Sequence, residues 1–183
     1  MMEPPVNSIK LSQTAKDQLV KLKRSTKIEQ WNILCRWAFC RSLAETAPPS
    51  LVPIPADSNL EMTWRIFGGE IADILILALR QRCDRDGLEL TPDILSQQFR
   101  LHLHRGIGYL AGDPNIRKIE HLVNLASLKQ LTVDSGLPLN FANEKAALLW
   151  ISLSAFVMTF KYGRYRTRTC DSLLVRQELY QLS

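Results

Sequence analysis

The spacing of apolar residues changes abruptly near residue 12, and this change limits what the first part of the chain can form. Residues 6–12 alternate between apolar and polar side chains, which is the pattern of a short strand. Its polar face would carry Ser8, Lys10 and Ser12. Apolar positions then recur at helical spacing, at Ala15, Leu19, Leu22 and Thr26. With Ser12 or Thr14 as the N-cap, the sequence predicts a strand followed directly by a helix.

A second helix is predicted over residues 29–44, after a break at residues 25–28. Its apolar face is broad and comprises Ile33, Leu34, Trp37, Ala38, Cys40 and Leu43. Strand, helix and helix in this order are the outline of a ribbon-helix-helix unit, in which two protomers pair their strands and the ribbon enters the DNA major groove. In that arrangement Ser8, Lys10 and Ser12 would face the bases. The same outline also begins many α-rich domains, and Glu29 in the first helical turn disfavours a phosphate there.

The rest of the chain is predicted to be helical after a connector at residues 46–55, where four prolines fall in ten residues. Ser58 is expected to cap a helix that reaches Phe67, and Gly68-Gly69 interrupts it before a helix over residues 70–84. The pairs Thr91-Pro92 and Asp113-Pro114 each predict a helix start, with helices to about residues 105 and 128. The predicted fold is mostly α, with a ribbon-helix-helix-like beginning followed by an α-helical bundle.

Positive charge is concentrated at the two ends of the chain. Residues 1–41 carry eight basic and three acidic side chains, residues 42–160 carry ten and thirteen, and residues 161–183 carry five and two. On a helix that begins near residue 13, Lys16, Lys23 and Lys27 fall within about 20° of one line. A basic edge of this kind indicates a polyanionic partner, because binding to phosphates releases condensed counterions. The alternative is an ordinary solvated lysine surface.

No catalytic, metal-binding or cofactor-binding site is predicted. His102 and His104 point about 200° apart on a helix, so they cannot share a metal ion. Asp84, Asp86 and Glu89 lack a calcium-loop pattern, and no phosphate-binding glycine motif is present. Cys40 beside Arg41 is the single candidate for a reactive thiol, but it lies on an apolar helix face. The four cysteines have no metal-ligand spacing, and no secretion signal opens the sequence, so a cytoplasmic location is expected.

Several stretches of sequence resemble the DndE family of DNA sulfur-modification proteins. They are residues 9–19 (IKLSQTAKDQL), residues 31–43 (WNILCRWAFCRSL), the Phe67-Gly-Gly-Glu70 turn and residues 101–110 (LHLHRGIGYL). The resemblance implies a small α-rich protein that forms a homo-oligomer, suggested to be a tetramer. It also implies binding to double-stranded DNA, nicked DNA included, beside partner proteins that replace a phosphate oxygen by sulfur. The lysines of the first helix would contact the DNA backbone, which corresponds here to Lys16, Lys21, Lys23, Arg24 and Lys27.

The sequence therefore divides into a DndE-like DNA-binding domain at residues 1–128, an apolar helical extension at 129–161 and a tail at 162–183. The apolar run at residues 146–160 is shorter than a membrane span and predicts a buried or interface helix, with membrane association as an alternative. Codons for Arg166-Thr-Arg-Thr can be antisense to a transfer-RNA arm, which predicts that the tail is non-native or disordered.

Two classes of function remain open at this point. The first is a DNA-binding accessory subunit of the phosphorothioation machinery, with no enzymatic activity, no cofactor and no membrane partner. Its contacts to DNA would come from Lys10, Lys16, Lys21, Lys23, Arg24 and Lys27. A ribbon-helix-helix transcriptional regulator is the alternative, and an enzyme component that acts on DNA is a weaker one.

Overall fold

A computed structural model describes residues 2–126, and within this part the fold is mostly α, as predicted. The elements follow one another as β1 (Ser8–Lys10), α1 (Gln13–Thr26), α2 (Trp31–Leu43), β2 (Glu61–Thr63), α3 (Trp64–Gly68), the 3-10 helix η1 (Gly69–Ile71), α4 (Ala72–Arg85), α5 (Pro92–Gly112) and α6 (Ile119–Ala126). The predicted order of strand, helix, helix and further helices is confirmed.

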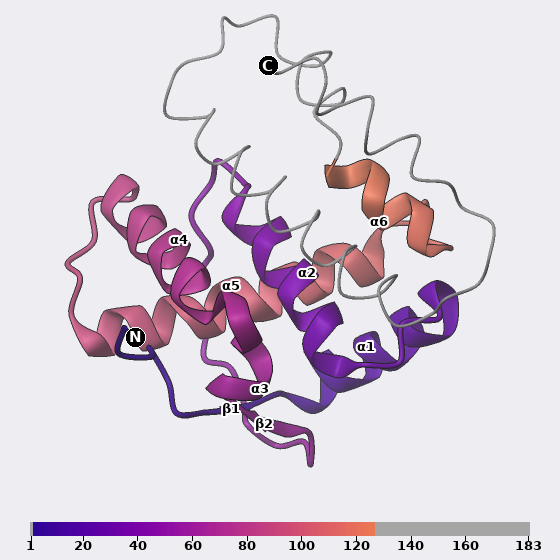
Figure 1. The fold of residues 1–183 in the computed structure, drawn as a ribbon, viewed down its shortest axis with the longest axis horizontal. Coiled ribbons are helices and arrows are strands. Elements are labelled where there is room, and N and C mark those ends of the chain that lie inside the picture. The colour runs from indigo at the N-terminus through magenta and orange to yellow at the C-terminus, as the bar shows by residue number, and fades with distance from the viewer. Residues whose placement is uncertain (1, 127–183) are drawn as a thin grey trace, which may run out of the picture.

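The long helix α5 runs across the molecule and supports the other elements (Figure 1). Its most extensive contact is with α2, which crosses it, and its next is with α1. In Figure 1, α4 lies near the beginning of α5, whereas α1 and α6 lie near its end. The short β1–β2 sheet lies at one edge of the helices.

Helix α1 forms as its sequence predicts. The Ser12 hydroxyl caps it by accepting a hydrogen bond from the N–H of Ala15 at 3.2 Å. Its buried residues are the predicted stripe Ala15, Leu19, Leu22 and Thr26. The helix ends where Lys27 adopts the left-handed conformation, with φ at 61°, and donates its N–H to the carbonyl of Lys23.

The hydrogen-bonding partner of β1 lies within the same chain. β1 pairs antiparallel with β2 of the same chain, in the register Ser8↔Thr63, Ile9↔Met62 and Lys10↔Glu61. The N–H of Leu11 donates to the carbonyl of Leu60 at 3.2 Å, which extends the ladder. The prediction that Ser12 faces outward beside Ser8 and Lys10 is wrong, because Ser12 is only 6% exposed and its hydroxyl caps α1.

Some helix boundaries differ from those predicted. Glu29 precedes α2 instead of lying in its first turn. Residues 58–67 include β2 and the short helix α3, and the true N-cap of α3 is Thr63. The Ser58 hydroxyl instead donates to the carbonyl of Leu11 at 2.7 Å. α5 continues seven residues beyond Arg105 to Gly112, and α6 begins only at Ile119.

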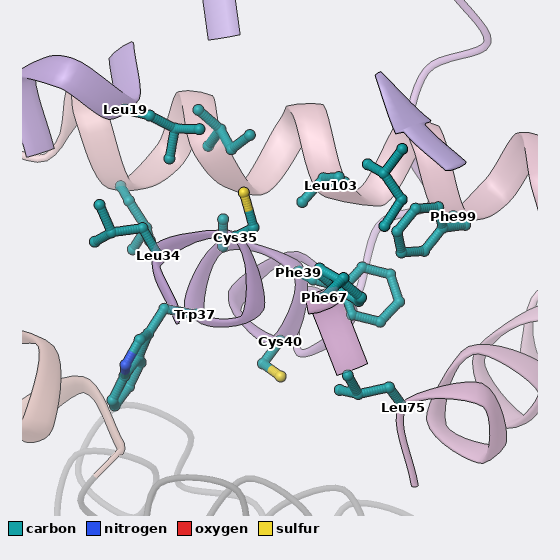
Figure 2. Packing of buried hydrophobic residues seen from close by; sticks show 14 of the residues in the cluster. Leu19, Leu34, Cys35, Trp37, Phe39, Cys40, Phe67, Leu75, Phe99 and Leu103 are labelled. Carbon is teal, nitrogen blue, oxygen red and sulfur yellow. The ribbon is translucent and has the colours of Figure 1, made fainter. Parts of the chain in front are cut away.

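The core contains a cluster of aromatic rings between α2, α3 and α5 (Figure 2). The centroid of Phe39 lies 5.9 Å from that of Phe67 and 5.1 Å from that of Phe99, and Trp64 lies 5.2 Å from Phe99. Edge-to-face and tilted pairs of this kind are favourable beyond the area they bury. The cluster holds α3, and with it the end of β2, against the crossing of α2 and α5.

The apolar extension predicted at residues 129–161 and the tail predicted at residues 162–183 lie outside the described residues. So does Cys170. Among residues 2–126, no helix is long and apolar enough to cross a membrane.

Candidate nucleic-acid interface

Lys16 and Lys23 lie on the edge of α1 that the helical spacing predicts, about a quarter-turn from the buried stripe. The ammonium of Lys16 donates to the side-chain oxygen of Asn59 at 2.7 Å. The ammonium of Lys23 lies over the Trp31 ring, 4.1 Å from its centroid. Both contacts hold the ammonium groups in place, and both partners are neutral.

The ammonium groups of Lys16 and Lys23 form no ion pair with a carboxylate of the described residues. Within residues 2–126 the ion pairs are Arg41–Glu45 and Arg82–Asp86, and neither involves a lysine of α1. An amide oxygen and an aromatic ring orient an ammonium but leave its full charge. A phosphate approaching the edge would therefore meet two oriented cations that have no ion-pair partner among residues 2–126.

Arg24 lies in the last turn of α1 and Lys27 is its C-cap, so both add positive charge at this end of the helix. Both side chains are exposed. They lie at the C-terminal end of the helix, where the macrodipole favours positive charge. We call Lys16, Lys23, Arg24 and Lys27 the α1 basic edge.

Lys21 and Lys10 lie apart from the α1 basic edge. Lys21 is about 140° from Lys16 around the helix. Its ammonium donates to the carbonyl of Ala111 at 2.9 Å, at the end of α5. It lines a shallow groove of about 270 Å³ together with Arg117.

Lys10 is exposed on β1 directly opposite Glu61, whose carboxylate accepts a hydrogen bond from Ser8. Lys10 therefore faces an acidic residue at the paired position of β2, so the six predicted residues do not form one uniform basic patch.

Asn59 and Trp31 were not among the predicted site residues. Asn59 follows the proline-rich connector and is brought to Lys16 by the pairing of β1 with β2. Trp31 begins α2 and reaches Lys23 because the left-handed residue Lys27 redirects the chain between the two helices. The sequence carries no local signal for the Asn59 contact, since it joins residues 43 positions apart. Only three residues separate Lys27 from Trp31, and this short connection could have suggested the ring contact.

Comparison with known proteins decides the family. The sequence profile described as DNA sulphur modification protein DndE matches residues 8–118, which is more than half of the chain. The chain belongs to the DndE family.

Among solved structures, a crystal structure of DndE from Escherichia coli B7A, described as involved in DNA phosphorothioation modification, is 29% identical with a TM-score of 0.50. The match covers 60% of this chain and 99% of that one. A crystal structure of a DndE mutant described as involved in DNA phosphorothioation is 28% identical, with a TM-score of 0.47 over 59% of this chain and 99% of that one. A search of curated proteins found no match.

The candidate thiol of this DndE-family chain is buried. Cys40 is 7% exposed on α2, and burial raises the pKa of its thiol to about 12, an effect that the charge of Arg36 only partly offsets. Cys35 is fully buried, and burial raises its thiol pKa to about 12 as well. Since the thiolate is the nucleophilic form, these residues are protonated at neutral pH and poorly suited to accept or transfer sulfur.

The two histidines of α5 of this DndE-family chain face different elements. The Nδ1 of buried His102 lies 3.0 Å from the hydroxyl of Ser42 on α2. The Nε2 of His104 accepts the N–H of Ser12 at 3.2 Å, so its Nδ1–H donates to the carbonyl of Arg100. Burial, together with the charge of Arg105, lowers the pKa of His102 to about 3. Both rings therefore serve contacts between elements.

Proposed function

We propose that this chain is a DNA-binding accessory subunit of the DNA phosphorothioation machinery, located in the cytoplasm. Membership in the DndE family supports the assignment of this chain to the DNA phosphorothioation system. The observation that supports DNA contact is the α1 basic edge, where Lys16 and Lys23 are oriented by neutral partners and keep their charge. Ammonium groups on a helix edge contact phosphates and carry no information about base sequence. The proposed ligand is accordingly duplex DNA of any sequence, nicked duplexes included.

We further propose that the chain is not an enzyme by itself and acts beside other DNA sulfur-modification proteins. The protonated, buried cysteines and the structural histidines support this proposal, because none of them offers a nucleophile or an exposed base. The purified chain alone would then neither cleave DNA, hydrolyse ATP nor insert sulfur. Turnover by the purified chain with any added cofactor would contradict the proposal.

A competition assay at several salt concentrations tests DNA binding directly. A labelled intact duplex is competed with random-sequence, nicked and phosphorothioated duplexes. We expect little discrimination among sequences and a log–log salt slope of about −3 per protomer, if three lysines each contact one phosphate. A palindromic site bound about a thousandfold more tightly than random DNA would instead identify a sequence-specific regulator. β1 already has an in-chain partner, β2, on one edge, which disfavours the two-stranded ribbon of two β1 strands that such a regulator would use.

We also propose that the chain self-associates, and the family resemblance suggests a tetramer. The reason inferred from the sequence, an unpaired strand, does not hold, because β2 pairs with β1. The support now comes from α4, whose outward side carries Ile74 at 37% and Leu77 at 53% exposure, one helical turn apart. The neighbouring residues Leu75 and Ile76 are buried on the inner side of the same helix. Sedimentation velocity at micromolar concentration is expected to give a species larger than a monomer, and a monomer would refute the proposal.

A further inference from the structure

The proline-rich connector between α2 and β2 is an extended, uncharged surface segment. Residues 46–56 contain no charged side chain in a protein that is 22% charged. Residues 48–57 form neither helix, strand, turn nor bend. Leu51 is 71% exposed and Val52 is 57% exposed, more than any other large apolar residue in the described part of the chain. An exposed stretch with this composition is unusual, because surface apolar area is normally kept dispersed.

Both ends of the connector are fixed by specific contacts. At its start, Arg82 donates to the carbonyl of Ala47 at 2.8 Å, and Arg105 donates to the same carbonyl at 2.8 Å. Arg82 is only 3% exposed and is itself ion-paired with Asp86. At the other end, the carboxylate of Asp57 accepts the N–H of Gln13 at 2.8 Å. The connector is therefore held extended between two fixed points and is not a loose loop.

In the middle of the connector, the groups available to a partner protein are mainly apolar side chains rather than backbone polar groups. Pro49 is buried and fixes one position, whereas Pro53 and Pro55 are exposed on either side of Ile54. Proline fixes φ near the polyproline value, so the segment loses little conformational entropy when it docks. Proline-rich extended segments of this kind bind in grooves that are lined by aromatic rings.

We infer that residues 48–55 form a docking segment, presented by the fold to an aromatic-lined groove on a partner protein. A second copy of this chain does not offer such a groove within the described residues. The large aromatic side chains there are buried or half-buried except Tyr109, which is 43% exposed. The groove beside Lys21 and Arg117 contains no aromatic residue. DNA is disfavoured as the occupant because the segment carries no positive charge to contact phosphates.

Taking the partner to be another DNA sulfur-modification protein rests on the proposed function. The test uses the full-length chain and the other sulfur-modification proteins of the same genome, co-expressed and purified. L51S/V52S is expected to lower affinity for them at least about tenfold, because the two most exposed apolar side chains would anchor the contact. The matched control, I66S/L90S, removes two exposed apolar side chains from other surfaces, at 56% and 39% exposure, and is expected to leave affinity within about twofold.

A peptide spanning residues 46–57 supplies a second readout that does not depend on folding of the variant. It is expected to displace the full-length chain from the modification proteins, whereas the same peptide with L51S and V52S is not. DNA affinity of the L51S/V52S protein should equal that of the wild type, which separates this inference from the DNA-binding proposal. Wild-type affinity of L51S/V52S for the modification proteins, or failure of the wild-type chain to bind them, would overturn the inference.

Discussion

Exchanging Lys16 and Lys23 for glutamate is expected to lower DNA affinity by about a hundredfold or more near 0.1 M salt. The two ammonium groups are oriented by Asn59 and Trp31 and lack a carboxylate partner among the described residues. Charge reversal removes two phosphate contacts and replaces them with repulsion, which costs several kcal/mol when like charges are brought together. The salt slope of binding should fall by about 0.9 for each contact that is lost. Fluorescence anisotropy over a series of salt concentrations measures both quantities.

The matched control for this variant is R80E/K118E, which changes the net charge equally but lies outside α1 and β1. If only total charge matters, the two variants will weaken DNA binding equally, and the α1 basic edge is then not the interface. Lys21→Glu gives a finer comparison, since Lys21 lies on the opposite flank and donates to the carbonyl of Ala111. Its reversal is expected to reduce DNA affinity much less than that of Lys16 or Lys23. Helical content and oligomer size should stay unchanged in every variant.

The α1 basic edge could be predicted from the sequence because it depends on local helical geometry alone. The positions of Lys16 and Lys23 relative to the buried stripe follow from 100° per residue once the N-cap at Ser12 is recognised. The contacts that orient the two ammonium groups could not be predicted in the same way. Asn59 reaches Lys16 through a strand pairing between distant segments, and periodicity says nothing about such pairings.

The missed strand β2 has a physical explanation as well. Three residues, Glu61–Thr63, are too few to show a period, and Ser58 offers a plausible helix cap just before them. What makes a strand there is the partner, because β1 presents unpaired backbone groups that β2 satisfies. The true cap is Thr63, whose hydroxyl accepts the N–H of Ile66, so α3 starts five residues later than a cap at Ser58 would place it.

The length of α5 shows the opposite effect, in which tertiary packing overrides local propensity. Gly106 and Gly108 disfavour a helix, so the sequence predicts an end near Arg105. The helix nevertheless continues to Gly112. At Gly106 the backbone of α2 approaches so closely that no side chain would fit. The packing gained at this crossing outweighs the low helix propensity of glycine.

Gly106→Ala is expected to destabilise the fold by about 3 kcal/mol or more, which lowers the melting temperature by roughly 12 °C. An alanine Cβ at this position would lie 1.8 Å from the carbonyl oxygen of Ala38 and 2.4 Å from its carbonyl carbon. Both are backbone atoms of α2, so no rotamer change relieves the clash and the two helices must move apart. The aromatic cluster around Phe39 and Phe99 would lose contacts as they separate.

Gly108→Ala is the matched control for this prediction, two residues further along the same helix. A Cβ at Gly108 meets nothing within 4 Å, so the substitution should stabilise the protein by about 0.5–1 kcal/mol through helix propensity alone. Thermal and urea unfolding followed by circular dichroism compare the three proteins. Equal or higher stability of Gly106→Ala would mean that α2 and α5 do not cross at Ala38. Opposite signs for the two substitutions are expected, because one glycine lies where two backbones meet and the other faces open space.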